Sequence, residues 1–242
     1  SVATQLNKPT VSTGSAMWQG GAYYQGYVYT VMYDTWTEGN VIYKGTTLYK
    51  TQVTETGDDP TQTVFGAPEK IGTTQDIEVG NLGFDYNTGR LYGVDLTHNG
   101  LCIIDRTTGS ADPVVEFSDP SGNFKTLMTA MTVICRNTET IILCGDMDGK
   151  LYTVDPNTGV LTCVYEGNGQ EYWYYAAMGY DYNTGNIYWN PSMGSGNNPL
   201  NLVVLQENMD GTYSAQVTKI GDVASKYGVE QVVIFTVPDV EP

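Results

Sequence analysis

Short runs of apolar and β-branched residues recur along the whole chain, and each run is closed by glycine, asparagine, aspartate or proline. The run Leu91–Asp95 is typical, because its side chains alternate in character and it follows the turn sequence Asn87-Thr88-Gly89. Asn-Thr-Gly and Asp-Gly sequences supply the left-handed conformations that hairpin connections require. No stretch of about ten residues has helical periodicity. The pattern therefore predicts an all-β protein built from hairpins.

These hairpins repeat at a fixed spacing. Residues 83–92 (Gly-Phe-Asp-Tyr-Asn-Thr-Gly-Arg-Leu-Tyr) recur as residues 179–188 (Gly-Tyr-Asp-Tyr-Asn-Thr-Gly-Asn-Ile-Tyr), and residues 133–142 form a degenerate copy between them. The offset of 96 residues (179 minus 83) is two periods of 48. A second strand-like run, another turn and a last short strand follow each copy. Four-stranded units that repeat every 40 to 50 residues predict a β-propeller.

The repeats define a single expected propeller domain over residues 1–237, with 238–242 as a linker or tail. The blade-like repeats are expected at about 15–72, 79–117, 127–166 and 176–221, with a closing strand at 230–237. The extra strand favours a five-bladed ring, which pairing with residues 2–11 would close. Four blades plus an extra strand, or a fragment of a larger propeller, remain alternatives.

Two kinds of string carry a resemblance to known proteins. The Tyr-x-x-Asp-Pro-x-Thr-Gly string at 152–159 and the Asp-Tyr-Asn-Thr-Gly-x-x-Tyr strings at Asp85 and Asp181 resemble blades of the bacterial YVTN- and PQQ-like propellers. The resemblance covers residues 79–221 well and 15–72 poorly. It implies a secreted or cell-surface bacterial repeat protein. It says little about function, because propellers serve as binders, scaffolds and enzymes. The tryptophans that dock PQQ blades are absent, which argues against a PQQ-dependent dehydrogenase.

Charge composition excludes several functions. The chain has 27 Asp and Glu against 11 Lys and Arg, a net charge of -16 and a single histidine. Too few basic residues are present to bind nucleic acid, and one imidazole cannot supply a three-histidine zinc site. No apolar run is long enough to span a membrane, so we expect no membrane insertion.

The cysteines lie inside apolar runs without zinc-site spacing: Cys102, Cys135, Cys144 and Cys163. We expect them to pack as small buried apolar residues; the alternative is that two of them form a disulfide.

The repeat register predicts where a ligand would bind. Tight turns connect strands one and two, and three and four, so the remaining, variable loops emerge together on the opposite face. Aromatic residues lie in or beside these loops and are our candidates for binding a glycan or a protein: Tyr33, Trp36, Tyr172, Trp173 and Trp189. Aromatic rings stack on sugars and form hot spots of protein interfaces. The alternative is that some of these rings pack between blades.

The acidic residues suggest at most one cation. Asp146 and Asp148 in the string Asp-Met-Asp-Gly resemble a short calcium loop, although the same string is also an ordinary turn. Asp85 and Asp181 occupy equivalent repeat positions and are expected to stabilise turns, as are Asp105 and Asp155.

The sequence favours a non-catalytic ligand-binding module of a larger multidomain chain, without a cofactor unless calcium binds at Asp146 and Asp148. A structural spacer is the alternative. A glycosidase or lyase comes third, with Asp85, Asp181 and Glu230 as candidate axial carboxylates. His98 lies in a turn, and no Gly-x-Ser-x-Gly sequence accompanies it.

Overall fold

The structure is a computed structural model of the 242-residue chain. It describes residues 17–54, 63–120, 126–136, 138–169, 173–192, 198–223 and 233–239. The regular structure in these ranges is all strand, so they contain no helix able to cross a membrane.

The strands form four antiparallel sheets. The first contains β1 (Met17–Tyr24), β2 (Tyr27–Glu38), β3 (Val41–Thr54), β4 (Val64–Phe65) and β5 (Glu69–Gln75). The second contains β6 (Val79–Asp85), β7 (Arg90–Asp95), β8 (Gly100–Ile104) and β9 (Ala111–Glu116). The third contains β10 (Met128–Arg136), β11 (Glu139–Asp146), β12 (Leu151–Val154) and β13 (Leu161–Tyr165). The fourth contains β14 (Trp173–Tyr180), β15 (Ile187–Ser192), β16 (Asn198–Glu207) and β17 (Tyr213–Val223).

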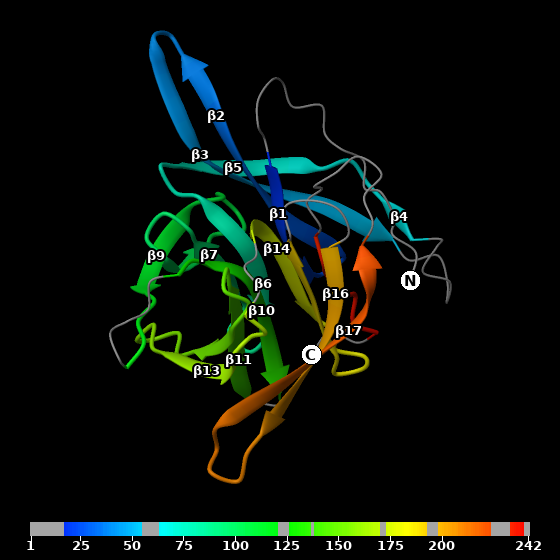
Figure 1. Ribbon diagram of the computed structural model, residues 1–242. Helices are drawn as coiled ribbons and strands as arrows, with labels where there is room; N and C mark the ends of the chain where they lie inside the picture. The colour runs from blue at the N-terminus through cyan, green and yellow to red at the C-terminus, as the bar shows by residue number, and fades with distance from the viewer. Residues whose placement is uncertain are drawn as a thin grey trace.

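The four sheets are arranged as the blades of a β-propeller (Figure 1). The first strand of each blade, β1, β6, β10 or β14, lies innermost, and each of these strands contacts its neighbours around the ring. In the second, third and fourth blades the following strands pair outward in chain order, whereas in the first blade both β4 and β5 pair with β3. The expectation of an all-β propeller is therefore confirmed. The preferred count of five blades is wrong, and the four-bladed alternative describes the molecule.

The C-terminal segment explains why the sequence suggested a fifth blade. Residues 233–239 form no ladder strand, but they fill the seam between the first and fourth blades. A Cβ atom on Gly21 of β1 would lie 2.5 Å from Val233 Cγ1, and one on Gly179 of β14 would lie 2.7 Å from Ile234 Cγ2. Thr236 Oγ1 donates a hydrogen bond of 2.6 Å to the carbonyl of Tyr180. The extra run thus wedges between two blades and does not begin a new sheet.

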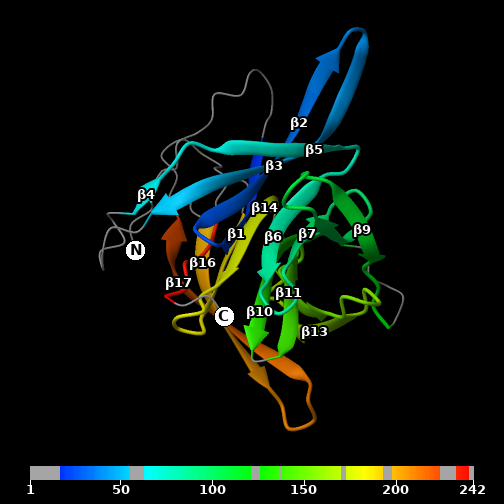
Figure 2. The same ribbon diagram turned by 180° about the vertical axis from the view of Figure 1, so that it is seen from behind.

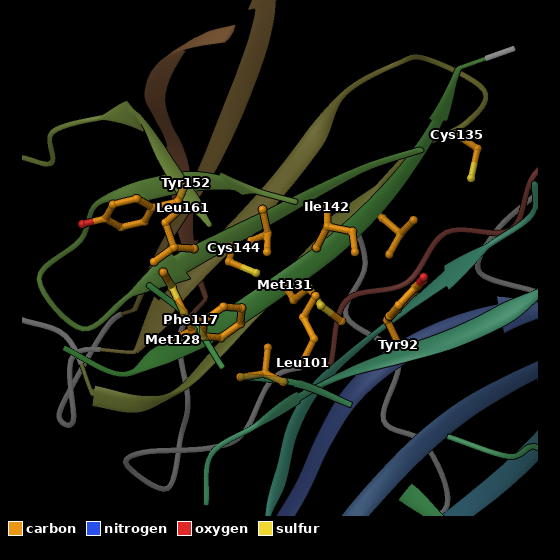
Figure 3. Packing of buried hydrophobic residues seen from close by; sticks show 13 residues of the cluster. Tyr92, Leu101, Phe117, Met128, Met131, Cys135, Ile142, Cys144, Tyr152 and Leu161 are labelled. Carbon is orange, nitrogen blue, oxygen red and sulfur yellow. The ribbon is translucent and has the colours of Figure 1, made fainter. Parts of the chain in front are cut away.

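Apolar side chains of adjacent blades pack together between the sheets. Figure 3 shows one such cluster, in which Tyr92 and Leu101 of the second blade meet Met131, Ile142 and Cys144 of the third. Burial of these apolar surfaces is the main force that holds neighbouring blades together.

Three of the four cysteines are buried as expected, and all four are free thiols. Cys163 is exposed instead. It lies on β13, the outermost strand of its blade, which has a blade strand on one side only.

The turn aspartates have the structural role that the repeat predicted. Asp85 accepts hydrogen bonds from the Asn87 amide (3.0 Å) and the Thr88 hydroxyl (2.6 Å). Asp181 makes the equivalent bonds to residues 183 and 184, and Asp105 and Asp155 accept bonds from the turns that follow them. Each carboxylate satisfies backbone donors that the tight turn leaves unpaired.

Candidate ligand-binding site

The most prominent feature of the variable-loop face is a projecting hairpin. β1 pairs with β2 only as far as Tyr33, and β5 pairs with β3 only as far as Gly45. β2 and β3 continue to pair with each other beyond these points, up to Glu38 opposite Val41. Within the described residues this extension, residues 34–44, consists of two strands, and we call it the arm. Both ribbon views show it standing clear of the blades (Figures 1 and 2).

The sequence analysis placed Tyr33 and Trp36 in or beside a variable loop, whereas both lie on strand β2. Threonine, tryptophan, tyrosine, valine and isoleucine, which favour strands, flank a two-residue turn at Gly39 and Asn40. Gly39 has a φ of 61°, the left-handed conformation that this turn needs. The two-residue Gly-Asn turn was the signal that could have identified the hairpin.

The strand register gives the arm two distinct faces. Trp36 lies opposite Tyr43 and Glu38 opposite Val41, and these four residues share one face because side chains alternate along a strand. Ile42 and Lys44 lie on the other face with Thr37. We call the face of Trp36, Glu38, Val41 and Tyr43 the aromatic face.

The aromatic face presents a flat, partly exposed surface. The rings of Trp36 and Tyr43 are stacked with centroids 5.8 Å apart and planes 20° apart, and both side chains are half-buried. The Trp36 indole N–H donates a hydrogen bond of 3.2 Å to Glu38 Oε1, which holds a carboxylate at the edge of the ring pair. Val41 is 52% exposed and Ile42, on the opposite face, is 76% exposed. An apolar, aromatic surface of this kind on a projecting element is typical of a binding site.

Acidic groups gather at the base of the arm. The Asp76 amide donates a hydrogen bond to the Lys44 carbonyl (2.9 Å), which brings residues 76–78 to this point. Burial raises the pKa of Glu78, while the Lys44 ammonium acts to lower it. Burial, and then the charges of Glu78 and Asp76, raise the pKa of Tyr33. The only lysine of the arm therefore faces carboxylates.

The other predicted aromatic residues do not join the arm. Trp189 is 2% exposed and belongs to the core between the third and fourth blades. Tyr172 lies outside the described residues, and so does the side chain of Trp173, whose backbone lies in β14. Of the five predicted residues, the structure thus places Tyr33 and Trp36 on one continuous strand, β2.

Asp146 and Asp148 differ sharply in environment. Asp146 is buried, and it accepts hydrogen bonds from the Lys150 amide (2.8 Å) and the Tyr152 hydroxyl (3.1 Å). Burial raises the pKa of its carboxyl to about 6. Asp148 is exposed. The described residues contain no group of three or more acidic, cysteine or histidine side chains able to hold a metal.

His98 forms a local pair with Asp95 on the same loop. Its Nδ1 lies 2.7 Å from Asp95 Oδ2, and this hydrogen bond, followed by the charge of Asp95, raises the pKa of the imidazole. Asp95 also accepts bonds from the amides of Thr97 and His98. The pair therefore closes a turn.

A buried asparagine on the innermost strand of the second blade connects three blades. The Asn81 amide of β6 donates to the Ala176 carbonyl (2.7 Å) and the Thr129 carbonyl (3.3 Å), and so links three blades across the centre. A cavity of about 30 Å³ lies at the tight-turn end, lined by Leu82, Tyr86, Val133 and their neighbours on the inner strands. It has room for only a water or two, and no carboxylate lines it. It does not offer the carboxylate pair that the glycosidase alternative requires.

Comparison with known proteins identifies no family for this chain. No family model matches the chain, and no curated protein matches it. Among solved structures it is similar to the computationally designed Ika4 protein, with 16% identity, a TM-score of 0.38 and coverage of 89% of this chain and 100% of that one. The computationally designed Ika8 protein matches at 12% identity and a TM-score of 0.34, covering 92% of this chain and 90% of that one. The chain is a four-bladed β-propeller with an aromatic arm.

Proposed function

We propose that this protein is a non-catalytic binding module that contacts a glycan or a protein through the aromatic face of its arm. The observation that supports it is the stacked, half-exposed pair of Trp36 and Tyr43 on a hairpin that projects beyond the blades. Keeping a large apolar surface in water is costly, and partners typically cover such surfaces. A rigid propeller would hold the arm in a fixed orientation, which lowers the entropy lost on binding.

The wider setting is part of the same proposal. The Asp-Tyr-Asn-Thr-Gly and Tyr-x-x-Asp-Pro-x-Thr-Gly strings support a secreted or cell-surface protein of bacterial origin. The proline and acidic residues of the sequence at 237–242 are typical of a linker and support a larger multidomain chain. A structural spacer would need no exposed aromatic pair, and this is why we prefer the binding module. A purely structural domain would tolerate any change on the aromatic face that preserves the fold.

A binding screen tests the proposal. The purified chain is applied to a glycan array and to a panel of immobilised peptides and proteins, beside Trp36→Ala and the matched variant Thr37→Ala on the opposite face. Loss of one hot-spot aromatic residue commonly weakens binding by about 2 kcal/mol or more, so we expect binding that Trp36→Ala removes and Thr37→Ala leaves intact. Binding that Trp36→Ala leaves unchanged, or the absence of binding to any array or immobilised partner, would contradict the proposal and favour a structural spacer.

A further inference from the structure

We propose that the ligand of the arm is an extended polypeptide segment with alternating cationic and apolar residues, which adds as a strand to the edge of β3 at residues 41–43. The inference rests on the proposed function and names its ligand. It combines three features of the arm: a free strand edge, an aromatic pair with a carboxylate beside it, and an excess of negative charge.

The first feature is the part of β3 that has a partner strand on one side only. β3 pairs with β2 on one side from Val41 to Gln52, and on the other side with β5 from Gly45 to Lys50. Asp76 has a φ of 60°, so the chain turns away immediately after β5 ends at Gln75. Within the described chain, no strand pairs with residues 41–43 on this side. An uninterrupted edge without proline, bulge or inward-pointing charge readily accepts another strand.

The aromatic face selects a cation. The faces of tryptophan and tyrosine rings attract guanidinium and ammonium groups, and here the Glu38 carboxylate is held 3.2 Å from the Trp36 indole nitrogen. A cation above the rings would therefore meet both π-electrons and a carboxylate. Sugars use aromatic platforms as well, but they gain less from a charged acceptor at the ring edge than an arginine does.

The register of the added strand follows from the arm. Partner residues opposite Val41 and Tyr43 would point to the aromatic face, and the residue opposite Ile42 would point to the other. Ile42 is 76% exposed, so an apolar partner residue there would remove its surface from water. Cationic and apolar positions therefore alternate in one register.

Charge distinguishes such a partner from a second copy of this chain. The net charge of -16 makes two copies repel each other, whereas it attracts a basic segment over long range. The base of the arm adds Glu78 and Asp76 around its only lysine. The arm thus fits a basic partner and resists self-association.

The experiment uses the full chain and a fluorescent alternating arginine–valine peptide of about six residues, a common strand length. Fluorescence anisotropy measures its dissociation constant beside two matched peptides. One carries citrulline, the neutral isostere of arginine, and the other has N-methylated backbone amides that prevent strand addition. We expect each of the two peptides to bind at least about tenfold more weakly. The citrulline peptide loses the cation–π contact and its carboxylate partner, and the N-methylated peptide loses the backbone hydrogen bonds of the added strand.

Three variants separate the arm from general electrostatic attraction. Trp36→Ala and Glu38→Gln should weaken binding by about tenfold and about threefold. Glu207→Gln makes the same charge change on the β16–β17 hairpin, which projects from the other end of the molecule (Figure 1), and should leave binding unchanged. Equal binding of the citrulline peptide, or equal loss in Glu38→Gln and Glu207→Gln, overturns the inference. Glycan binding that needs Trp36, without peptide binding, overturns the inference and leaves the proposed function standing. Absence of both overturns both.

Discussion

Asp146 shows how the same acidic residue type takes different roles in one repeat. Asp85 and Asp181 lie in turns and cap backbone amides, whereas Asp146 lies at the end of β11 and is 1% exposed. Burial disfavours the ionised carboxylate, and the two hydrogen bonds from Lys150 and Tyr152 only partly offset this cost. At neutral pH the ionised Asp146 carboxylate therefore destabilises the folded protein.

We expect Asp146→Asn to stabilise the protein at pH 8 and to have little effect at pH 4. The folded-state pKa of about 6 lies above the ordinary value of 3.8, so the stability that the protonated carboxyl contributes is complete below pH 4 and is lost as pH rises through 6. A tenfold change in proton affinity is worth about 1.4 kcal/mol, and the gain at pH 8 should be on the order of 2 kcal/mol. Urea unfolding at the two pH values measures it.

Asp148→Asn is the matched control, because it removes the same charge from an exposed site. A pH-independent effect of Asp146→Asn would contradict the burial argument. The same variants test the prediction that calcium binds at Asp146 and Asp148. A melting temperature that rises with calcium, falls with chelator and loses both responses in Asp146→Asn would show a bound cation.

At the scale of elements, the Thr-Gly turns do more than close hairpins. Gly159, in the β12–β13 turn, lies against the outer strand of the preceding blade, where the Ser118 amide donates to its carbonyl (3.0 Å). Gly109, in the β8–β9 turn, lies in the same way against Gly72 of β5. Each turn therefore docks one blade onto the edge of its neighbour, and this protects an exposed strand edge.

We expect Gly159→Ala to be clearly more destabilising than Gly89→Ala. Both glycines have nearly the same left-handed φ, 72° and 71°, and each amide donates a 2.8 Å bond to the aspartate of its turn. A Cβ on Gly159 would collide with the Glu116 carbonyl, whereas one on Gly89 would have nothing within 4 Å. The conformational cost of about 1 kcal/mol is common to both, and the collision should add at least about 1 kcal/mol more. Chemical denaturation of both variants measures the difference, and equal losses would show that the docking contributes nothing.

The sequence was informative about these elements wherever the relevant interaction is local. The Asn-Thr-Gly turns, the strand pattern and the 48-residue period are properties of short segments, so they predicted hairpins, a repeat and a propeller. The docking of Gly159 and the bridge that Asn81 makes to Thr129 and Ala176 depend on which blade lies next, and no local pattern encodes that. The arm was missed for a different reason. Its residues were interpreted as a variable loop because the repeat implied one, although their own composition favours strands.

At the scale of the whole molecule, the ring is closed by a segment that belongs to no blade. The asparagines of the two Asp-Tyr-Asn-Thr-Gly strings show what this segment replaces. Asn87 donates a 3.0 Å hydrogen bond to the Glu139 carbonyl of the next blade, and Asn183 donates an equal bond to the Val237 carbonyl. Residues 233–237 thus take the place that another blade would occupy beside the fourth. The extra run at the end of the sequence was predicted to close the circle, and it lies at the closure without forming a strand there.

This closure predicts that Gly21→Ala will loosen the C-terminal segment. A Cβ on Gly21 would lie 2.5 Å from Val233 Cγ1 and 2.8 Å from the Ile234 carbonyl oxygen, too close for either to remain in place. We expect a loss of about 1–3 kcal/mol in the free energy of unfolding, the usual cost of overpacking, and faster hydrogen–deuterium exchange of the amides in 233–239. Gly221→Ala is the control, because a Cβ there would have nothing within 4 Å. Retained protection of 233–239 in a destabilised Gly21→Ala variant would show that the seam is held by contacts other than this segment.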